Sequence, residues 1–242
     1  MSLTYLGYSA FKFDLSGLCL YIDPYFRDPV DWTRLTAGHV VLLSHGHFDH
    51  GVMAAGDLFE RWHCKFVGPR ALMQWMVRKY RRRIPADMFV TLNEGESLEL
   101  SGVKIEAIPA HHPTNRLGKT LLALFARCSA PGKPVNGYFI DGYYHSGDTV
   151  YSPAIIQALQ GKKIHTACIP IGGKYMVATP AEALRIAEEI GAARLVPMHW
   201  QPLVEQVPFR YQPSDLVKLA RDSKTTVEVC PLAIGQILEP HS

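Results

Sequence analysis

Four side chains of the kind that bind metal ions fall within six consecutive residues of this 242-residue chain. They are His45, His47, Asp49 and His50, in the segment VVLLSHGHFDH. Residues two apart face the same side of an extended backbone, so we expect His45 and His47 to bind one ion together. Asp49 and His50 then point elsewhere and are expected to reach a second ion, while Gly46 permits a tight turn. The competing interpretation, a polar loop with solvated histidines, fits this spacing less well.

Three other places in the chain supply the ligands that such a site still lacks. A hydrolytic site with two metal ions needs about seven imidazole and carboxylate ligands and an open position for water. Each candidate directly follows an expected strand. The candidates are His111 or His112, then Asp148, then His199. A single histidine at a strand end is more often structural, so the prediction depends on all of these residues occurring together and in this order.

The elements that must position these residues are short apolar strands. Apolar runs at residues 40–43, 103–109, 143–146 and 194–197 each end just before a candidate ligand. A strand-rich half with helices is followed by a second half built the same way. The pattern alone predicts an α/β or α+β fold with mixed sheets. The order of the two halves suggests that two sheets pack face to face with helices outside, in a four-layer αβ/βα sandwich. Helices are expected at residues 51–63, 69–80, 153–160, 180–190 and 213–221, and further strands at 121–127, 225–230 and 234–238.

At these residues the chain resembles the metallo-β-lactamase superfamily. The shared pattern is HxHxDH at residues 45–50, a histidine near 110, GDT at residues 147–149 and a late histidine. Longer segments resemble the branch that includes ascorbate-6-phosphate lactonases and phospholipase-D-like hydrolases of N-acylethanolamine phospholipids. These segments are LTYLGYSAFKF, LYIDPYF, PAHHPTNR and IPIGGKYMVATPAEALRIAEEIGAARLVPMHW. The resemblance runs from residue 3 to about residue 200 and implies that family's αβ/βα sandwich fold.

The resemblance also implies which residues bind each ion. It assigns His45, His47 and His112 to the first metal, Asp49, His50 and His199 to the second, and Asp148 to a bridge between them. His112 is preferred over His111 because the family's ligand stands three residues after a proline, here Pro109. His111 would then line the pocket or hydrogen-bond to a ligand. Tyr8 is a departure, because many relatives carry histidine there; that position is not a ligand, but local substrate contacts are expected to differ.

The reaction implied is hydrolysis by a hydroxide shared between two divalent metal ions, with a small ester, lactone or phosphodiester as substrate. Asp49 and Asp148 are expected to orient the hydroxide, and His111 is a candidate proton donor to the leaving group. Zn²⁺ suits an imidazole-rich site best, and Mn²⁺ also suits this ligand set. Expected contacts to an anionic substrate are Arg116, Lys174 and Tyr175.

Two other functions stay open at this stage, a nuclease of the same fold acting on RNA or DNA, and a non-catalytic metal-binding protein. The nuclease is disfavoured because the chain lacks an inserted domain and has only one basic run, at residues 78–83. That run is either a solvated helix end or a guide for an anionic substrate. A non-catalytic protein is disfavoured because all seven expected ligands are present. Antibiotic-type lactamases would carry a cysteine where this chain has Asp148. Diiron oxygen reductases would carry a glutamate where it has His47. Both classes are therefore disfavoured.

Composition predicts a single cytoplasmic domain spanning residues 1–242. The net charge of +3 is weak, which argues against nucleic acid as the main partner. The five cysteines include no CxxC pair and are expected to be reduced. No apolar run approaches the ~20 residues that span a bilayer, and no signal peptide is evident. The expected partner is a small-molecule substrate, and a homo-oligomer is compatible with the sequence.

Overall fold

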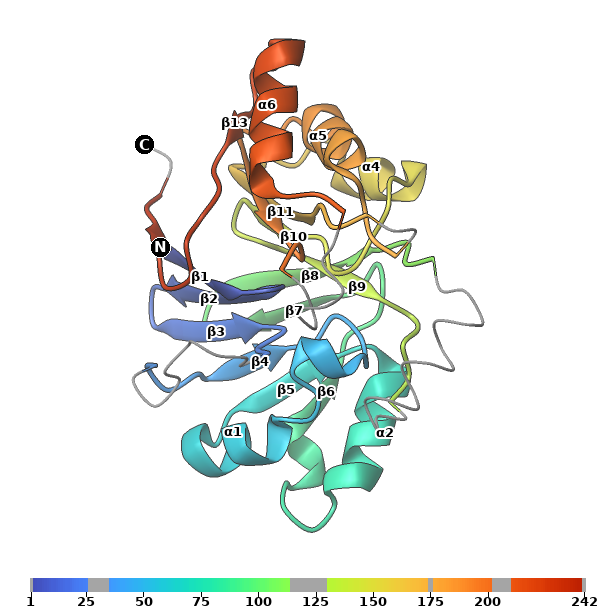
Figure 1. Cartoon of the computed structure of the whole chain (residues 1–242). Coiled ribbons are helices and arrows are strands. Elements are labelled where there is room, and N and C mark those ends of the chain that lie inside the picture. The colour runs from blue at the N-terminus through green and yellow to red at the C-terminus, as the bar shows by residue number, and fades with distance from the viewer. Residues whose placement is uncertain (1, 26–34, 114–129, 174–175, 202–209, 241–242) are drawn as a thin grey trace.

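The chain forms two seven-stranded β-sheets that lie face to face, with helices on both outer faces (Figure 1). The computed structural model describes residues 2–25, 35–113, 130–173, 176–201 and 210–240. Each sheet contains both parallel and antiparallel pairs. The predicted four-layer αβ/βα sandwich of two mixed sheets is therefore confirmed. The strand expected at residues 121–127 lies outside the described residues.

The first sheet has the strand order β14-β1-β2-β3-β4-β5-β6. Short turns join β1, β2 and β3 into an antiparallel meander, whereas β3 to β6 run parallel. The last strand of the chain crosses over to pair with β1, which the sequence pattern did not indicate. The strands are β1 (Ser2–Gly7), β2 (Ala10–Leu15), β3 (Leu18–Ile22), β4 (Val40–Leu42), β5 (Lys65–Gly68), β6 (Phe89–Thr91) and β14 (Ile237–Leu238).

The second sheet has the order β13-β12-β11-β10-β9-β8-β7. The strands that come first in the sequence, β7 to β10, pair antiparallel, and β10 to β13 run parallel. The strands are β7 (Ser97–Leu100), β8 (Val103–Pro109), β9 (Asn136–Ile140), β10 (Tyr143–His145), β11 (Thr166–Pro170), β12 (Arg194–Met198) and β13 (Glu228–Val229).

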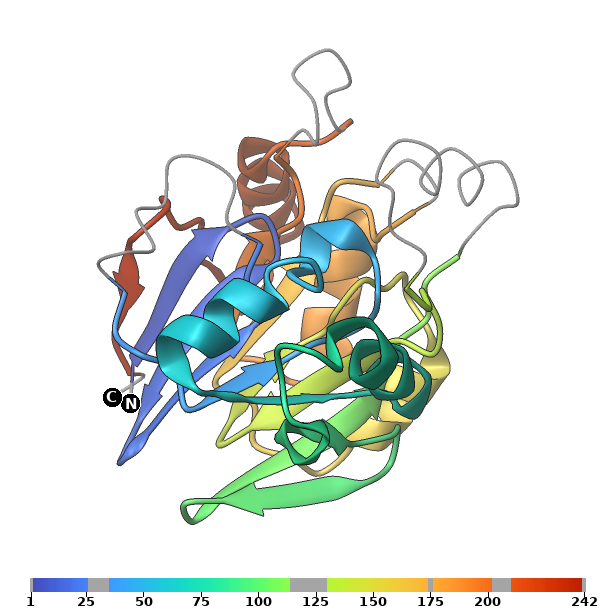
Figure 2. The same cartoon turned by 90° about the horizontal axis from the view of Figure 1, so that it is seen from below.

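Helices cover the outer face of each sheet. Figure 2, seen from below, places α1 and α2 in front of the strands, and Figure 1 places α4, α5 and α6 on the opposite side. The helices are α1 (Ala55–Trp62), α2 (Arg70–Tyr80), α4 (Pro153–Leu159), α5 (Pro180–Glu189) and α6 (Pro213–Ser223). The α5 start shows the expected cap, because the Thr179 hydroxyl accepts the backbone N–H of Glu182. Among the described residues, no helix has the length and apolar character needed to cross a lipid bilayer.

The start of α1 differs from the sequence prediction. A helix was expected from Gly51, but α1 begins at Ala55. Residues Phe48–His50 form a single 3-10 turn instead, and Gly51 ends it with φ of +80°. That left-handed conformation suits glycine and stops a continuous helix. The two chain-closing strands are likewise shorter than predicted, at two residues each.

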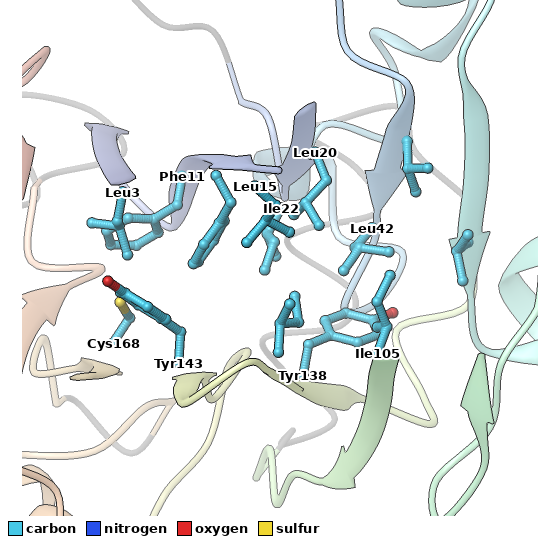
Figure 3. Close-up of a cluster of buried hydrophobic side chains, with 14 of the residues drawn as sticks. Leu3, Phe11, Leu15, Leu20, Ile22, Leu42, Ile105, Tyr138, Tyr143 and Cys168 are labelled. Atoms are coloured by element: carbon cyan, nitrogen blue, oxygen red, sulfur yellow. The ribbon is translucent and has the colours of Figure 1, made fainter. Parts of the chain in front are cut away.

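Apolar side chains from both sheets fill the space between them. Figure 3 shows Leu3, Phe11, Leu20 and Ile22 of the first sheet facing Tyr138 and other residues of the second. Phe11, Leu20, Ile22 and Tyr138 have no exposed surface. This continuous core fixes how the sheets face each other, and it thereby fixes the relative positions of the loops at their shared edge.

Strand direction explains why distant segments meet at that edge. In the first sheet, β4 runs parallel to β3 and β5. In the second, β8 and β10 are both antiparallel to β9, so they share a direction, and β12 runs parallel with β11 and β10. The carboxyl ends of β8, β10 and β12 therefore emerge together. Crevices outside the carboxyl ends of strands are the usual binding sites of such sheets.

Candidate metal centre

Seven candidate ligands gather where β4, β8, β10 and β12 end. Their ligand atoms form two sets, and within each set every ligand atom lies within 4.8 Å of the others. The first group is His45, His47, His112 and Asp148; the second group is Asp49, His50 and His199. All of these side chains are buried except His47, which is half-buried. The six buried ones are histidines and aspartates that water would normally solvate, so their joint burial needs a compensating partner.

The first group is centred on His45. Its Nε2 lies 2.8 Å from Nδ1 of His47 and 3.8 Å from Oδ2 of Asp148. Nε2 of His112 is also 3.8 Å from that carboxylate oxygen. The loop after β4 thus supplies two imidazoles, the segment after β8 a third, and the segment after β10 a carboxylate.

The second group lies on the other side of Asp148. Nε2 of His199 is 3.3 Å from Oδ1 of Asp148 and 3.7 Å from Oδ2 of Asp49. Nε2 of His50 is 3.4 Å from Oδ2 of Asp148. Oδ2 of Asp148 therefore lies near imidazoles of both groups, and Oδ1 lies near His199 of the second. This is the placement expected of a carboxylate shared between two groups.

Gly46 is needed here for a reason that differs from the predicted one. Its φ is not among the positive values, so left-handed freedom is not what the turn uses. A Cβ at this position would lie 2.5 Å from the backbone oxygen of Pro131 and 2.8 Å from Cβ of Ala130. The Gly46 N–H donates to that same Pro131 oxygen at 3.0 Å. The glycine therefore allows a close approach of the 130–132 segment, which packs onto the histidine loop.

Hydrogen bonds fix which ring nitrogen of two histidines faces the site. Nδ1 of His112 lies 2.7 Å from the Met176 carbonyl, which can only accept, so Nδ1 carries the hydrogen. Nδ1 of His45 lies 2.9 Å from Oγ of Ser44, whose hydroxyl donates to Asp23. Nδ1 of His45 therefore donates as well. In both rings Nε2 is left with a free electron pair directed at the group, as a metal ligand requires.

Asp23 plays the same part for His50 and was not among the predicted site residues. One of its oxygens lies 2.7 Å from Nδ1 of His50, and Ser44 donates both its N–H and its hydroxyl to this carboxylate. Asp23 is fully buried and holds a left-handed backbone with φ of +46°. The sequence carried a weak signal, an aspartate at a strand end before Pro24. Asp23 and His50 are 27 residues apart in the sequence, so no local pattern indicated that they pair.

Burial keeps most imidazoles of the first group neutral. It lowers the pKa of His45 well below its usual value, and the nearby His50 and His47 add to the effect. It lowers the pKa of His47 to about 4 and also lowers that of His112. Neutral imidazole is the form that binds a cation. These three rings therefore need not lose a proton to do so at neutral pH.

His50 and Asp148 behave in the opposite way. Burial disfavours the charged form of His50, but the carboxylates of Asp148, Asp23 and Asp49 outweigh it and raise its pKa well above the usual value. Burial alone would raise the pKa of Asp148, yet His199 and His50 hold it well below its usual range. Asp148 is thus an anion in the folded protein, and His50 carries the balancing charge in the absence of a cation.

The donor set fits divalent cations. Oδ1 of Asp49, Nε2 of His50, Nε2 of His112 and Oδ1 of Asp148 are buried and make no hydrogen bond within the described part of the chain. Buried polar atoms of this kind are normally satisfied by a partner. Imidazole nitrogen with carboxylate oxygen is the ligand chemistry of zinc, and it also accommodates manganese. Metal ligation by these seven residues stays a prediction.

The remaining predicted site residues lie elsewhere or outside the described residues. The side chain of His111 is exposed and lies in neither ligand group, while its backbone N–H donates to the Thr149 hydroxyl at 2.9 Å. Arg116, Lys174 and Tyr175 lie outside the described residues. The basic run starts in the last turn of α2, which begins beyond the carboxyl end of β5 and runs back from it. It therefore lies away from the edge that holds the two groups.

The arrangement of layers and the strand-end site define a metallo-β-lactamase fold. The chain belongs to the β-lactamase superfamily, whose domain profile ("Beta-lactamase superfamily domain") matches residues 20–200. It is 31% identical to a UPF0173 metal-dependent hydrolase of Korarchaeum cryptofilum, over 82% of each chain. It is 28% identical to a protein of the same description from Methanopyrus kandleri, over 99% of this chain and 100% of that one. The predicted superfamily is therefore confirmed, and the chain is one of its metal-dependent hydrolases.

A solved structure supports the fold independently. The metallo hydrolase Igni18 from the archaeon Ignicoccus hospitalis superposes with a TM-score of 0.77, covering 98% of this chain and 97% of that one. The two sequences are only 22% identical. A likeness at this level concerns the architecture alone.

Proposed function

We propose that this protein is a dinuclear metal-dependent hydrolase that cleaves a small ester, lactone or phosphodiester. The observation that carries the proposal is the position of Asp148, whose carboxylate lies 3.3–3.8 Å from imidazole nitrogens of both groups. A site for one ion needs no second set of three ligands beside it. Zn²⁺ is the cation that this donor set favours, and Mn²⁺ is the alternative.

Each group has its own task in this proposal. His45, His47 and His112 hold the first ion, and Asp49, His50 and His199 hold the second, with Asp148 shared. When bound, two divalent ions would lower the pKa of a water molecule to ~7 and polarise the substrate oxygen. The protein supplies fixed ring orientations, through Ser44, Asp23 and the Met176 carbonyl, so little rearrangement is needed at the moment of reaction.

The carboxylates and His111 handle protons. Asp49 and Asp148 orient the attacking water and accept its hydrogen bonds, for which the low pKa of Asp148 keeps that residue ionised. His111 is exposed beside Thr149, where it can reach a leaving group that enters from solvent. Arg116, Lys174 and Tyr175 are proposed to bind an anionic part of the substrate, on the basis of sequence alone. A cytoplasmic location, and activity as one domain without nucleic acid, also belong to the proposal.

A substrate panel tests the proposal directly. Metal-free protein would be reconstituted with zinc or with manganese and assayed on a lactone, a carboxylic ester and a phosphodiester of matched leaving group. We expect at least one class to be hydrolysed, with activity lost on chelation and restored by one of the two cations. Hydrolysis that persists unchanged after complete chelation would contradict the proposal. Activity on single-stranded RNA or DNA that exceeds all three small substrates would favour a nuclease instead.

A further inference from the structure

Gln201 stands two residues after the candidate ligand His199, in the loop that leaves β12. Its side chain is half-buried and belongs to neither ligand group. It reaches the turn between β1 and β2, where Tyr8 is 193 residues away in the sequence. Because β1 and β2 belong to the first sheet and β12 to the second, this side chain links the two sheets beside the second group.

Two hydrogen-bond donors of the first sheet converge on the amide oxygen of Gln201. The Tyr8 N–H donates to Oε1, and the Tyr5 hydroxyl donates to the same oxygen at 2.9 Å. The Tyr5 hydroxyl also lies 3.2 Å from the Tyr8 carbonyl. A backbone N–H can only donate, so the oxygen of the amide must face the turn, and not its NH₂ group. The chemistry of the donors thus fixes the orientation of this side chain.

The same turn also holds the backbone of His199. The His199 N–H donates to the Tyr8 carbonyl at 2.8 Å, and the ring centroids of Tyr8 and His199 lie 4.3 Å apart. The N–H of Tyr8 is therefore held by Gln201, while its carbonyl holds His199. A displacement of the His199 backbone must strain or break one of these bonds.

The backbone at both ends of this link has an uncommon conformation. Tyr8 has a φ of +58° and His199 a φ of +53°, values that are rare outside glycine. Such conformations persist only where the surrounding structure enforces them. The bonds that Gln201 accepts are among the constraints that keep Tyr8, and through it His199, in place.

The polar group of Gln201 is needed at this position, and its bulk alone would not suffice. An apolar side chain of similar length would fill the same space but would leave the Tyr8 N–H without this acceptor, which destabilises the contact. The first group is held by other bonds, because Ser44 and the Met176 carbonyl orient the rings of His45 and His112. The effect of changing Gln201 should therefore reach the second group and spare the first.

We propose that Gln201 is a positioning residue for the second cation, which ties the loop after β12 to the β1–β2 turn and thereby places the imidazole of His199. This inference rests on the proposed function, because it assumes that the second group binds a cation. Gln201 contacts neither the cation nor the reacting atoms in this assignment. Partners that orient a metal ligand typically change the affinity about 10–100-fold. Because Gln201 acts through the backbone of His199, we expect the lower end of that range.

Calorimetric titration of metal-free protein with Zn²⁺ tests the assignment without any substrate. In Gln201→Met we expect the first ion to bind as in the wild type and the second about 10-fold more weakly. The matched control is Gln236→Met. It removes an exposed glutamine whose amide oxygen likewise accepts a backbone N–H, that of Ala233 at 2.9 Å. This control should bind both ions as the wild type does.

Titration with Co²⁺ adds a readout that a purely structural role would not move. The visible absorption of Co²⁺ depends on the ligands around each ion. In Gln201→Met the absorption that appears with the second equivalent should differ from that of the wild type, and the absorption of the first should match it. Tyr5→Phe, which removes only one of the two bonds to the Gln201 oxygen, should weaken the second ion by a smaller factor.

The outcomes separate the role of Gln201 from the proposed function. Equal affinity and equal absorption of the second ion in Gln201→Met and wild type would overturn the role and leave the proposed function standing. A wild-type protein that binds fewer than two ions would overturn both. Thermal unfolding of the metal-free variants identifies a folding defect, and a folded Gln201→Met chain that loses both ions equally would also contradict the role. If Gln201→Met does not fold, Tyr5→Phe decides, and an unchanged second ion in that variant would overturn the assignment.

Discussion

The first group and the second group lie side by side at one edge of the sandwich, but different chemistry holds them. The first is dominated by imidazoles that burial keeps neutral, and their supports are a hydroxyl and a backbone carbonyl. The second depends on a buried aspartate, Asp23, that pairs with His50, and on Tyr8. The first group would bind a cation at neutral pH without losing a proton, whereas the second would have to displace a proton from His50.

This difference indicates unequal binding of the two ions. A site that releases no proton changes its affinity little with pH, and one that releases a proton binds more weakly as the pH falls. Supports of the second group also come from two separate places in the first sheet, the β1–β2 turn and the end of β3. The second group should therefore be the more easily disturbed.

Asp148→Ala should have the largest effect, because it removes a carboxylate that lies close to histidines of both groups. We expect hydrolysis to fall by at least about 10²–10³-fold, the loss seen when one preorganised charged group is removed, and the metal content to fall as well. Turnover and metal analysis on the same sample measure this. Asp87→Ala, at an exposed aspartate in the first turn of a 3-10 helix, is the control and should change neither. Unchanged turnover in Asp148→Ala would rule out the shared role.

Gly46→Ala should disturb the first group by displacing the segment that packs on it. The new Cβ would lie 2.5 Å from a backbone oxygen that cannot move alone, so we expect a loss of about 1–3 kcal/mol in unfolding free energy. Gly56→Ala is the matched control. Its Cβ would meet only the end of the flexible, exposed Arg83 side chain, within α1 where alanine is favoured by up to ~1 kcal/mol. Denaturant unfolding of both variants would show whether the loop packing matters.

Asp23→Asn should affect mainly the second group. The amide keeps an acceptor for the Ser44 N–H but removes the charge that faces His50. We expect the second ion to bind about 10–100-fold more weakly and the first nearly as before. Metal titration would measure both steps, with the half-exposed Asp14→Asn as control. If the first ion were the one lost, the division of supports between the groups would be wrong.

The metal-free protein should lose stability as the pH falls from about 6.5 to about 4. The pKa of His47 drops from 6.5 to about 4 on folding, so the unfolded chain binds more protons in that window and is favoured by acid. Each such proton contributes at most about 1.4 kcal/mol per pH unit. His47→Gln should show a shallower slope of unfolding free energy against pH over this window. A slope identical to that of the wild type would mean that the burial of His47 does not make the unfolding free energy depend on pH in this window.

Changes in the basic run should have the smallest effect. Arg81 and Arg82 are exposed and follow the 11-residue helix α2, about 16 Å along its axis from the edge where β5 ends. We therefore expect the double variant Arg81→Ser, Arg82→Ser to hydrolyse the substrate as the wild type does. A rise in KM for an anionic substrate that disappears at high salt would instead support the guiding role.

The sequence was sufficient for the layers and for the strand ends that carry the candidate ligands. Apolar runs and the residues after them are local patterns, and β4, β8 and β12 lie close to the predicted positions. The start of α1 was misplaced because the 3-10 turn at Phe48–His50 depends on the loop geometry around the histidines. The pairing of β14 with β1 rests on two residues, too few for a pattern.

The residues that hold the candidate ligands in place could not be predicted from the sequence, for a different reason. Asp23 meets His50 and Tyr8 meets His199 only because the sheets are already packed, so no spacing in the chain encodes either contact. Gly46 illustrates the same limit. The sequence predicted that Gly46 permits a tight turn, but what requires glycine there is the approach of Pro131 from 85 residues away (131 minus 46) and not the conformation of the glycine itself.

The central claim is that two adjacent groups each hold one divalent cation, and counting bound ions tests it most directly. Metal-free wild type, His45→Ala and Asp49→Ala would be titrated with Zn²⁺ under identical conditions. We expect the wild type to bind two ions per chain. We expect His45→Ala to lose the tighter ion. We expect Asp49→Ala to lose the weaker ion, whose binding depends more strongly on pH. A wild-type protein that saturates at one ion, or a His45→Ala variant that still binds two as the wild type does, would contradict the central claim.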